Sequence, residues 1–296
     1  MFVIFGASGK VGHATAVALR NAGRPVRAVV RSARQGEALA KIGCEIAIAD
    51  LTDPASVASA IKGATAVQML CPVSVGDIDP ASTMERMIDV AAHALRADPP
   101  PAVLALSDYG AELERGTGLT RLFHLLEERL KPLATQLTLL RSAEHAQNWA
   151  AMLPVMLATG RLPSLHQPLD RAFATVATQD VGKLAAELLL EGPSAKTPRV
   201  ISVEGPRRVS LVDVARAFSA VVGREIVAEA VPRTAWAPML QRAGLSTNHV
   251  QLITELYDAV NAGQIDVEKG ISEQRFGKTE LHDVFAAMLA AHVKSR

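Results

Sequence analysis

The first residues of the chain constrain its fold more than any other stretch. An apolar run, FVIF at residues 2–5, passes directly into GASGKVG, in which Gly6, Gly9 and Gly12 stand three apart. Glycine tolerates positive φ and close backbone approach, so the pattern predicts a strand that turns sharply into a helix. Backbone N–H groups at the start of such a helix attract phosphate. The segment therefore indicates a strand–turn–helix unit that binds a dinucleotide.

The same loop carries three further candidate residues for binding the cofactor, Ser8, Lys10 and Val11. The glycine spacing is GxxGxxG and not GxGxxG, and a glycine triplet alone is a weak signal. Its context strengthens it, because the triplet follows the first strand, opens the first helix and is followed by a second strand ending near Val30.

Further β-type runs alternate with amphipathic segments along the first half of the chain: PVRAVV, CEIAIA, TAVQML, AVLALS and LTLLRS. Continuous apolar strands joined by helices are typical of a parallel sheet that is buried on both faces. The predicted fold is a Rossmann-type doubly wound α/β sheet with helices on both faces. Helices are expected over residues 11–22, from Pro54 to near Gly63, and over 82–97 and 119–131.

The regular alternation loosens after about residue 145. Residues 1–145 are expected to form the nucleotide-binding domain, joined by a strand near 198–204. Residues 146–296 are expected to form a smaller α/β region, mostly helical, on the substrate side. By analogy with doubly wound folds, such a region closes over the carboxyl ends of the strands.

The end of the second strand predicts which cofactor is preferred. An acidic residue about 20 positions beyond the loop suits the ribose hydroxyls of NAD, whereas arginine accommodates the 2′-phosphate of NADP. This chain has Arg31, Ser32 and Arg34 there, and no acid. Two guanidinium groups and a hydroxyl favour NADP. Asp50, after the third strand, either accepts a hydrogen bond from the adenine amino group or serves the local turn, with Asp53 capping the next helix.

Composition excludes several other classes of protein. A net charge of +1 argues against direct nucleic-acid binding, and two cysteines, Cys44 and Cys71, are too few for a disulfide framework. The eight histidines show no HxxxH or HExxH spacing, so no metal site is expected, and no GxSxG elbow occurs. With no charged segment before the first apolar run and no apolar stretch long enough to cross a bilayer, a cytoplasmic protein is expected.

Several motifs together resemble the NmrA-like group of atypical short-chain dehydrogenases/reductases: GASGKVG, VRSAR, ADLTDP, VQMLCP, SDYGAE with GTGL and LFHLLEERL, LTLLRSAEHAQNW, and the later ATVATQDVGKLAAELL. The resemblance implies a Rossmann fold that binds NADP(H). Members range from NAD(P)H-dependent reductases of quinones and related acceptors to redox sensors that bind the cofactor without turnover.

The resemblance also implies roles for single residues. The three loop glycines match the phosphate loop of the family, and Arg31 matches its reader of the 2′-phosphate. Asp50 and Leu51 match the pair that contacts adenine. Leu70 and Pro72 match the end of the fourth strand, beside the ribose on the nicotinamide side.

Catalytic residues are less clearly marked. Typical short-chain dehydrogenases place a lysine four residues after a tyrosine to lower the pKa of the phenol, but Leu113 stands four residues after Tyr109. The candidates are Tyr109 and Ser107 after the fifth strand, and His124 on the following helix. A histidine on an apolar helix face also serves as an ordinary core residue.

Two hypotheses about function follow. One is an NADP(H)-dependent reductase that transfers hydride to a small electrophile such as a quinone. The other is a non-catalytic NADP(H)-sensing regulator that acts through a protein partner. A sugar-nucleotide epimerase or dehydratase is disfavoured because it needs the tyrosine–lysine pair.

Overall fold

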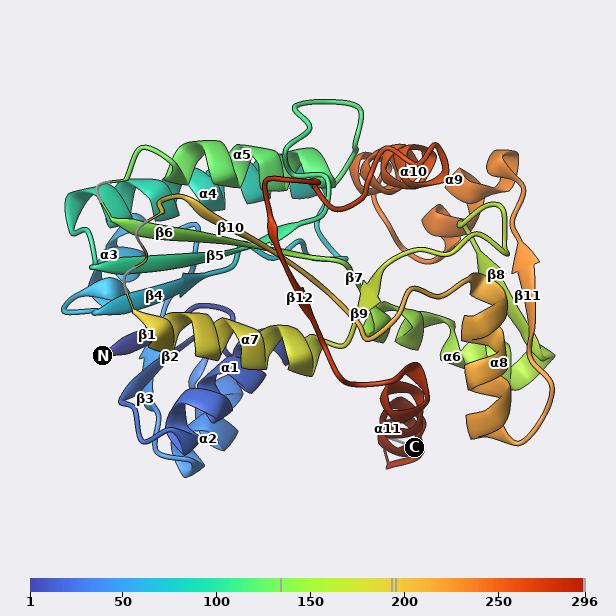
Figure 1. Cartoon of the computed structure of the whole chain (residues 1–296), viewed down its shortest axis with the longest axis horizontal. Helices are drawn as coiled ribbons and strands as arrows, with labels where there is room; N and C mark the ends of the chain where they lie inside the picture. Colours follow the sequence, from blue (N-terminus) through green and yellow to red (C-terminus); the bar gives the residue numbers. More distant parts are fainter. Residues whose placement is uncertain (134, 193, 195, 295–296) are drawn as a thin grey trace.

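A parallel β-sheet organises the computed structural model, which describes residues 1–133, 135–192, 194 and 196–294 (Figure 1). Within those residues the sheet has eight strands, in the order β12 (Glu273–Phe276), β10 (Arg199–Glu204), β6 (Gln136–Ser142), β5 (Ala102–Asp108), β4 (Ala66–Met69), β1 (Phe2–Ile4), β2 (Val26–Val30) and β3 (Glu45–Ile48). Neighbouring strands run parallel. The predicted doubly wound α/β fold is confirmed. The chain adds β2 and β3 on one side of β1 and then crosses to add β4, β5 and β6 on the other side, so the strand order reverses between β1 and β4.

Helices cover both faces of the sheet (Figure 1). One face carries α3 (Pro54–Ile61), α4 (Pro80–Ala97) and α5 (Thr120–Leu130), and the other carries α1 (Lys10–Asn21), α2 (Ala33–Lys41) and α7 (Thr178–Glu191). Asp53 caps α3 as predicted, since its carboxylate accepts from the N–H groups of Ala55 and Ser56. The helix expected from residue 82 begins at Pro80, because Asp79 caps it by accepting from the Ser82 N–H.

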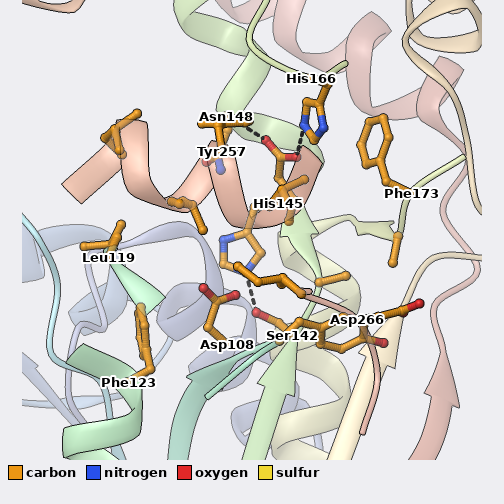
Figure 2. A pocket seen from close by; sticks show the side chains of 18 of the residues that line it. Asp108, Leu119, Phe123, Ser142, His145, Asn148, His166, Phe173, Tyr257 and Asp266 are labelled. Atoms are coloured by element: carbon orange, nitrogen blue, oxygen red, sulfur yellow. Dashed lines mark hydrogen bonds and ion pairs between the residues drawn. The ribbon is translucent and has the colours of Figure 1, made fainter. Parts of the chain in front are cut away.

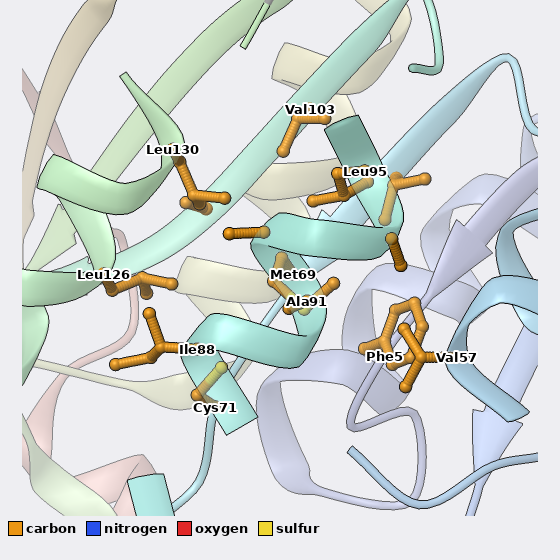
Figure 3. Close-up of a cluster of buried hydrophobic side chains, with 14 of the residues drawn as sticks. Phe5, Val57, Met69, Cys71, Ile88, Ala91, Leu95, Val103, Leu126 and Leu130 are labelled. Carbon is orange, nitrogen blue, oxygen red and sulfur yellow. The ribbon is translucent and has the colours of Figure 1, made fainter. Parts of the chain in front are cut away.

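Burial on both faces of the sheet explains why its strands are continuous apolar runs in the sequence. Every residue of β4 is buried, because helices pack on both of its faces. Figure 3 shows the cluster between the sheet and α3 to α5, where Phe5 lies beside Val57 and Ile88 lies near Leu126. Burying each of these side chains contributes about 1.5–3 kcal/mol to folding.

The second half of the chain builds a further group of elements beside the sheet (Figure 1). They are β7 (Glu144–His145), a 3-10 helix (Ala146–Met152), α6 (Leu153–Thr159), β8 (Arg161–Ser164), β9 (Thr175–Val176), α8 (Leu211–Val222), β11 (Val227–Ala230), α9 (Arg233–Arg242), α10 (Thr247–Asn261) and α11 (Leu281–Lys294). A separate apolar cluster holds several of them together, with Phe218 and Phe285 stacked 3.7 Å apart. Trp149 packs edge-on against Phe285.

Two strands of this second half lie in the main sheet. β10 pairs with β6, and β12 pairs with β10 at the edge. Asp180 of α7 fixes the segment after β12, since its carboxylate accepts from the N–H groups of Lys278 and Thr279 and from the Thr279 hydroxyl. The chain therefore leaves the sheet after β10 and returns to the neighbouring position.

None of the helices in the described part of the chain is long and apolar enough to span a membrane.

Candidate functional site

The glycine loop joins β1 to the N-terminus of α1, as predicted. Gly6 has φ +66°, a left-handed conformation that favours glycine. Gly12 lies so close to the turn that an added Cβ would stand 2.3 Å from the Gly6 carbonyl oxygen. Gly9 is the N-cap of α1, and no side chain caps the helix there. The free helix N-terminus and the compact turn form a cradle that fits a pyrophosphate.

The other loop residues divide between solvent and the interior. Ser8, Gly9 and Lys10 are exposed, whereas Val11 is buried and faces a cavity described below. No acidic residue lies in the first turn of α1, so nothing there opposes an anion.

The basic residues predicted to bind a 2′-phosphate lie together at the end of β2. Arg31, Ser32 and Arg34 are exposed, and Ser32 is the N-cap of α2 without a side-chain hydrogen bond to that helix. Hydrogen bonds from the Thr52 N–H and hydroxyl lower the pKa of Asp50, and the positive charge of Arg31 acts in the same direction. The carboxylate of Asp50 therefore lies near Arg31 at the same sheet edge. Leu51 beside it is half-buried against the core.

A cavity of about 520 Å³ lies at the carboxyl ends of β4, β5 and β6. Val11, Leu70 and Pro72 form its wall toward the glycine loop, and residues of α10 and of the segment 166–174 form the opposite wall. Its volume and apolar lining suit a small organic molecule. Large apolar side chains on its walls include Leu119, Phe123, Phe173, Ile253, Leu256 and Ile265.

Three polar side chains, which we call the polar corner, lie where β5 and β6 end: Asp108, Ser142 and His145. Figure 2 shows them directed toward one another in the cavity. The Nε2 atom of His145 lies 3.2 Å from the Ser142 hydroxyl oxygen. The pKa of His145 is lowered to about 4, mainly by burial and to a smaller extent by the charge of Lys10, against the opposing effect of Glu144. The imidazole is therefore neutral at pH 7.

The pKa of Asp108 is shifted upward, whereas that of His145 is shifted downward. Its Oδ2 atom accepts a hydrogen bond from the Thr120 hydroxyl at 2.8 Å. Part of the side chain opens onto the cavity, but protein surrounds the carboxyl, and this burial raises the pKa of Asp108 to about 7 against the hydrogen bonds that it accepts. The negative charges of Glu144 and Glu112 raise it as well. A substantial fraction of Asp108 is thus protonated at neutral pH.

Glu144 forms a second polar group in the same cavity. Its carboxylate lies 2.8 Å from His166 Nε2 and accepts from the Tyr257 hydroxyl at 3.1 Å. Burial acts to raise the pKa of Glu144, but its interaction with His166 and the hydrogen bonds with His166 and Tyr257 outweigh burial and hold the pKa below its usual value. His166 in turn stacks on Phe173, with ring centroids 4.1 Å apart. Glu144 therefore stays ionised.

The sequence-predicted catalytic residues occupy different environments. Tyr109 and Ser107 line the cavity, but the Tyr109 hydroxyl donates to Glu204 at 3.3 Å and the Ser107 hydroxyl donates to Glu127 at 2.6 Å. Burial raises the pKa of Tyr109, and Glu204 adds to this shift. His124 is absent from the described cavity wall, and its Nδ1 atom lies 2.9 Å from the Ala111 carbonyl oxygen.

A buried ion network supports the floor of the cavity. The Arg141 guanidinium donates to both oxygens of Glu127, at 2.8 and 2.7 Å, and also to Glu112 at 3.0 Å and Glu268 at 2.6 Å. Because Glu127 lies on α5 and Arg141 on β6, the network fixes α5 against the strand ends. The Ser107 hydroxyl joins it from β5.

The polar corner and the Glu144 group were not predicted from the sequence. Asp108 stands between Ser107 and Tyr109, two predicted candidates, at the end of the same strand. The available signal was position, because polar residues at the carboxyl ends of adjacent parallel strands face one site. Nothing comparable marks His166, in the loop after β8, or Tyr257, in the middle of α10. Among the described residues, no group of three or more side chains has the composition of a metal site.

The cradle at α1, the basic edge of β2 and the adjoining cavity together define a nucleotide-binding Rossmann protein. The chain belongs to the NAD(P)H-binding family, whose profile matches residues 6–192.

Relatives cover nearly the whole chain. Quinone oxidoreductase 2 of Escherichia coli is 24% identical over 287 residues, which is 92% of this chain and 93% of that protein. The crystal structure of the NADPH-dependent quinone oxidoreductase QOR2 of Escherichia coli, in complex with NADPH, superimposes with a TM-score of 0.78 over 98% of this chain and 100% of that one, at 20% identity. The triphenylmethane reductase of Citrobacter gives a TM-score of 0.80 at 17% identity, covering 98% and 99% of the two chains. NmrA, a negative transcriptional regulator in complex with NAD, gives 0.76 at 16% identity, covering 99% and 96%.

Proposed function

We propose that this protein is an NADP(H)-dependent reductase that passes a hydride to a small electrophile such as a quinone. The observation that carries the proposal is the cavity of about 520 Å³, whose wall includes Val11 of the glycine loop. A cofactor held by that loop has a largely apolar chamber beside it for an acceptor. A protein that only senses the cofactor has no need of such a chamber.

The basic edge of β2 supports a preference for NADP(H) over NAD(H). Arg31 and Arg34 offer charge-assisted hydrogen bonds, and Ser32 offers a hydroxyl at the N-terminus of α2. The first turn of α2 holds no acid that would repel a phosphate. Asp50, near Arg31, is available to accept from the adenine amino group.

The bound cofactor supplies the hydride, and the chain supplies position and surroundings. Leu70 and Pro72 confine the cavity on the glycine-loop side, while Phe123 and Phe173 present aromatic faces within it. Apolar walls limit water around the reacting atoms, and holding two reactants in contact lowers the entropic part of the barrier. An electron-poor ring such as a quinone suits these walls by shape and polarity. The relative from Escherichia coli is named for this acceptor class.

The test measures loss of NADPH absorbance with a panel of small quinones, alongside a fluorescence titration of cofactor binding. Turnover that is faster with NADPH than with NADH is the expected result. The control is Gly9→Val, which blocks the phosphate cradle. Tight NADPH binding without turnover of any acceptor would contradict the reductase and favour a non-catalytic, cofactor-sensing regulator; the structural neighbour NmrA is a negative transcriptional regulator in complex with NAD.

A further inference from the structure

Asp108 is a carboxyl group at the end of β5 that lines the cavity beside Ser142 and His145. We propose that Asp108 is a catalytic residue that donates a proton to the oxygen of a quinone or other carbonyl acceptor as that acceptor takes up hydride. The inference rests on the proposed reductase function and names the group that completes its chemistry.

The geometry around Asp108 suits a donor. The residue ends β5, lines the cavity, and has Oδ2 occupied by the hydrogen bond from Thr120 at 2.8 Å. That bond orients the carboxyl, and the Tyr109 N–H is a second donor to it. We place the acid proton on Oδ1, the oxygen that Thr120 does not bind. Ser142 and His145 lie next to it in the polar corner, so an acceptor oxygen that reaches this end of the cavity meets polar groups (Figure 2).

The neighbouring candidates are engaged elsewhere. The hydroxyl protons of Tyr109 and Ser107 point to Glu204 and Glu127. His145 is neutral at pH 7, because burial lowers its pKa to about 4, and a neutral imidazole is a poor acid. His124 is not on the described part of the cavity wall. The Ser142 hydroxyl, 3.2 Å from His145 Nε2, is a far weaker acid than a carboxyl. Asp108 is therefore the strongest proton donor in the polar corner near neutral pH.

Glu144 explains how two carboxyl groups in one cavity take different states. His166 and Tyr257 stabilise the charge of Glu144, and that charge in turn disfavours ionisation of Asp108. Environments that push two pKa values apart are the usual means of dividing acid and base roles in an active site. Glu112, from the loop after β5, adds a further negative charge near Asp108, although Arg141 binds it.

The quinone receives a hydride, with both electrons, from the reduced cofactor and becomes the hydroquinone monoanion, while the cofactor is oxidised. The O–H bond of the Asp108 carboxyl breaks and its proton forms the second O–H bond of the hydroquinone. A phenolic oxygen has an ordinary pKa of about 10, so a carboxyl of pKa about 7 gives up its proton to it readily. Water then reprotonates Asp108.

The test exploits acceptors that differ in their need for a proton. Menadione, a quinone, needs one proton for each hydride, whereas malachite green, a triarylmethane cation, becomes its neutral leuco form by hydride alone. Asp108→Asn keeps the shape of the side chain and removes the acid. We expect this variant to lose roughly 100-fold in kcat with menadione, within the range for general acids, and to reduce malachite green within a few-fold of wild type. Asp89→Asn, which alters an exposed ion pair with Arg129, is the matched control.

A pH profile gives a second readout. The kcat for menadione should fall as the pH rises through about 7, because the donor then loses its proton. Thr120→Val removes a hydrogen bond that lowers the pKa of Asp108, so the fall should move to higher pH. Glu144 and His145, which also face Asp108, change charge well below this range. In the protein without cofactor, the carboxyl-carbon NMR signal that disappears in Asp108→Asn should titrate near pH 7.

The outcomes separate the two proposals. If wild type reduces neither acceptor, the reductase function fails and the role of Asp108 fails with it. If wild type reduces menadione and Asp108→Asn does so at an unchanged rate and with an unchanged pH profile, only the role of Asp108 is overturned. Equal losses with both acceptors, or an NMR titration near the ordinary pKa of aspartate, would also overturn it. If wild type does not reduce the dye, the pH shift in Thr120→Val decides.

Discussion

The buried guanidinium of Arg141 allows a stability effect to be worked out from the structure. The side chain is 4% exposed, and Glu127, which it binds through two hydrogen bonds, is 1% exposed. In Arg141→Met the length of the side chain is retained, but a buried carboxylate is left without its partner. Removing one partner of a buried pair costs about 3–5 kcal/mol. The Ser107 hydroxyl still donates to Glu127, so we expect the lower end, about 3 kcal/mol.

The assay is urea unfolding followed by tryptophan fluorescence at pH 7 and pH 5. An uncompensated buried carboxylate takes up a proton more readily, so the folded variant binds more protons than its unfolded chain, and the deficit should shrink as the pH falls. Arg129→Met is the control, because its partner Asp89 and the arginine itself are exposed and such pairs contribute under about 1 kcal/mol. A deficit for Arg141→Met no larger than that of the control, or one that is independent of pH, would refute the reasoning.

The remaining predictions concern the cofactor loop and the α5 helix. Arg31→Asp should weaken NADPH binding roughly 10- to 100-fold more than NADH binding, the size of a lost charge-assisted hydrogen bond; titrations that show equal losses would remove the 2′-phosphate role. Gly9→Val should abolish cofactor binding and leave circular dichroism unchanged, because Gly9 has an ordinary φ of −80°; retained affinity would contradict the phosphate cradle. His124→Ala should change kcat by only a few-fold, since its ring contacts the Ala111 carbonyl; a 100-fold loss would identify it as catalytic.

The sheet and its cofactor loop were predictable because their signals are local. A strand such as β4 is buried on both faces, so its sequence AVQM is largely apolar. The start of a helix is indicated by a capping residue such as Asp53. The glycine loop is likewise recognised from a few consecutive residues. β12 gave no such signal, because EQRF lies at the sheet edge, where Glu273, Gln274 and Phe276 are exposed and no apolar pattern is required.

The chemistry of the cavity was not predictable in the same way. Glu144 and Tyr257 are 113 positions apart, and their hydrogen bond exists only because α10 crosses the ends of the strands. The altered pKa of Asp108 arises from burial by surrounding segments and from the charge of Glu144, neither of which its own neighbours in the sequence reveal. Conversely, the sequence left Tyr109 as a candidate catalytic residue without its usual lysine, and only the fold shows that its hydroxyl donates to Glu204.

The return of the chain to the sheet at β12 affects how the acceptor side of this protein can diversify. Residues 205–272, which carry α10 and its cavity wall, leave from β10 and re-enter at the strand beside it. Topologically they are an insertion between two adjacent positions of one sheet, and closing a longer or shorter excursion changes the free energy only slowly with its length. The glycine loop, where we propose that the cofactor binds, lies outside that insertion. Substitutions on the cavity-facing side of α10 can therefore change one wall of the acceptor chamber and leave the glycine loop untouched.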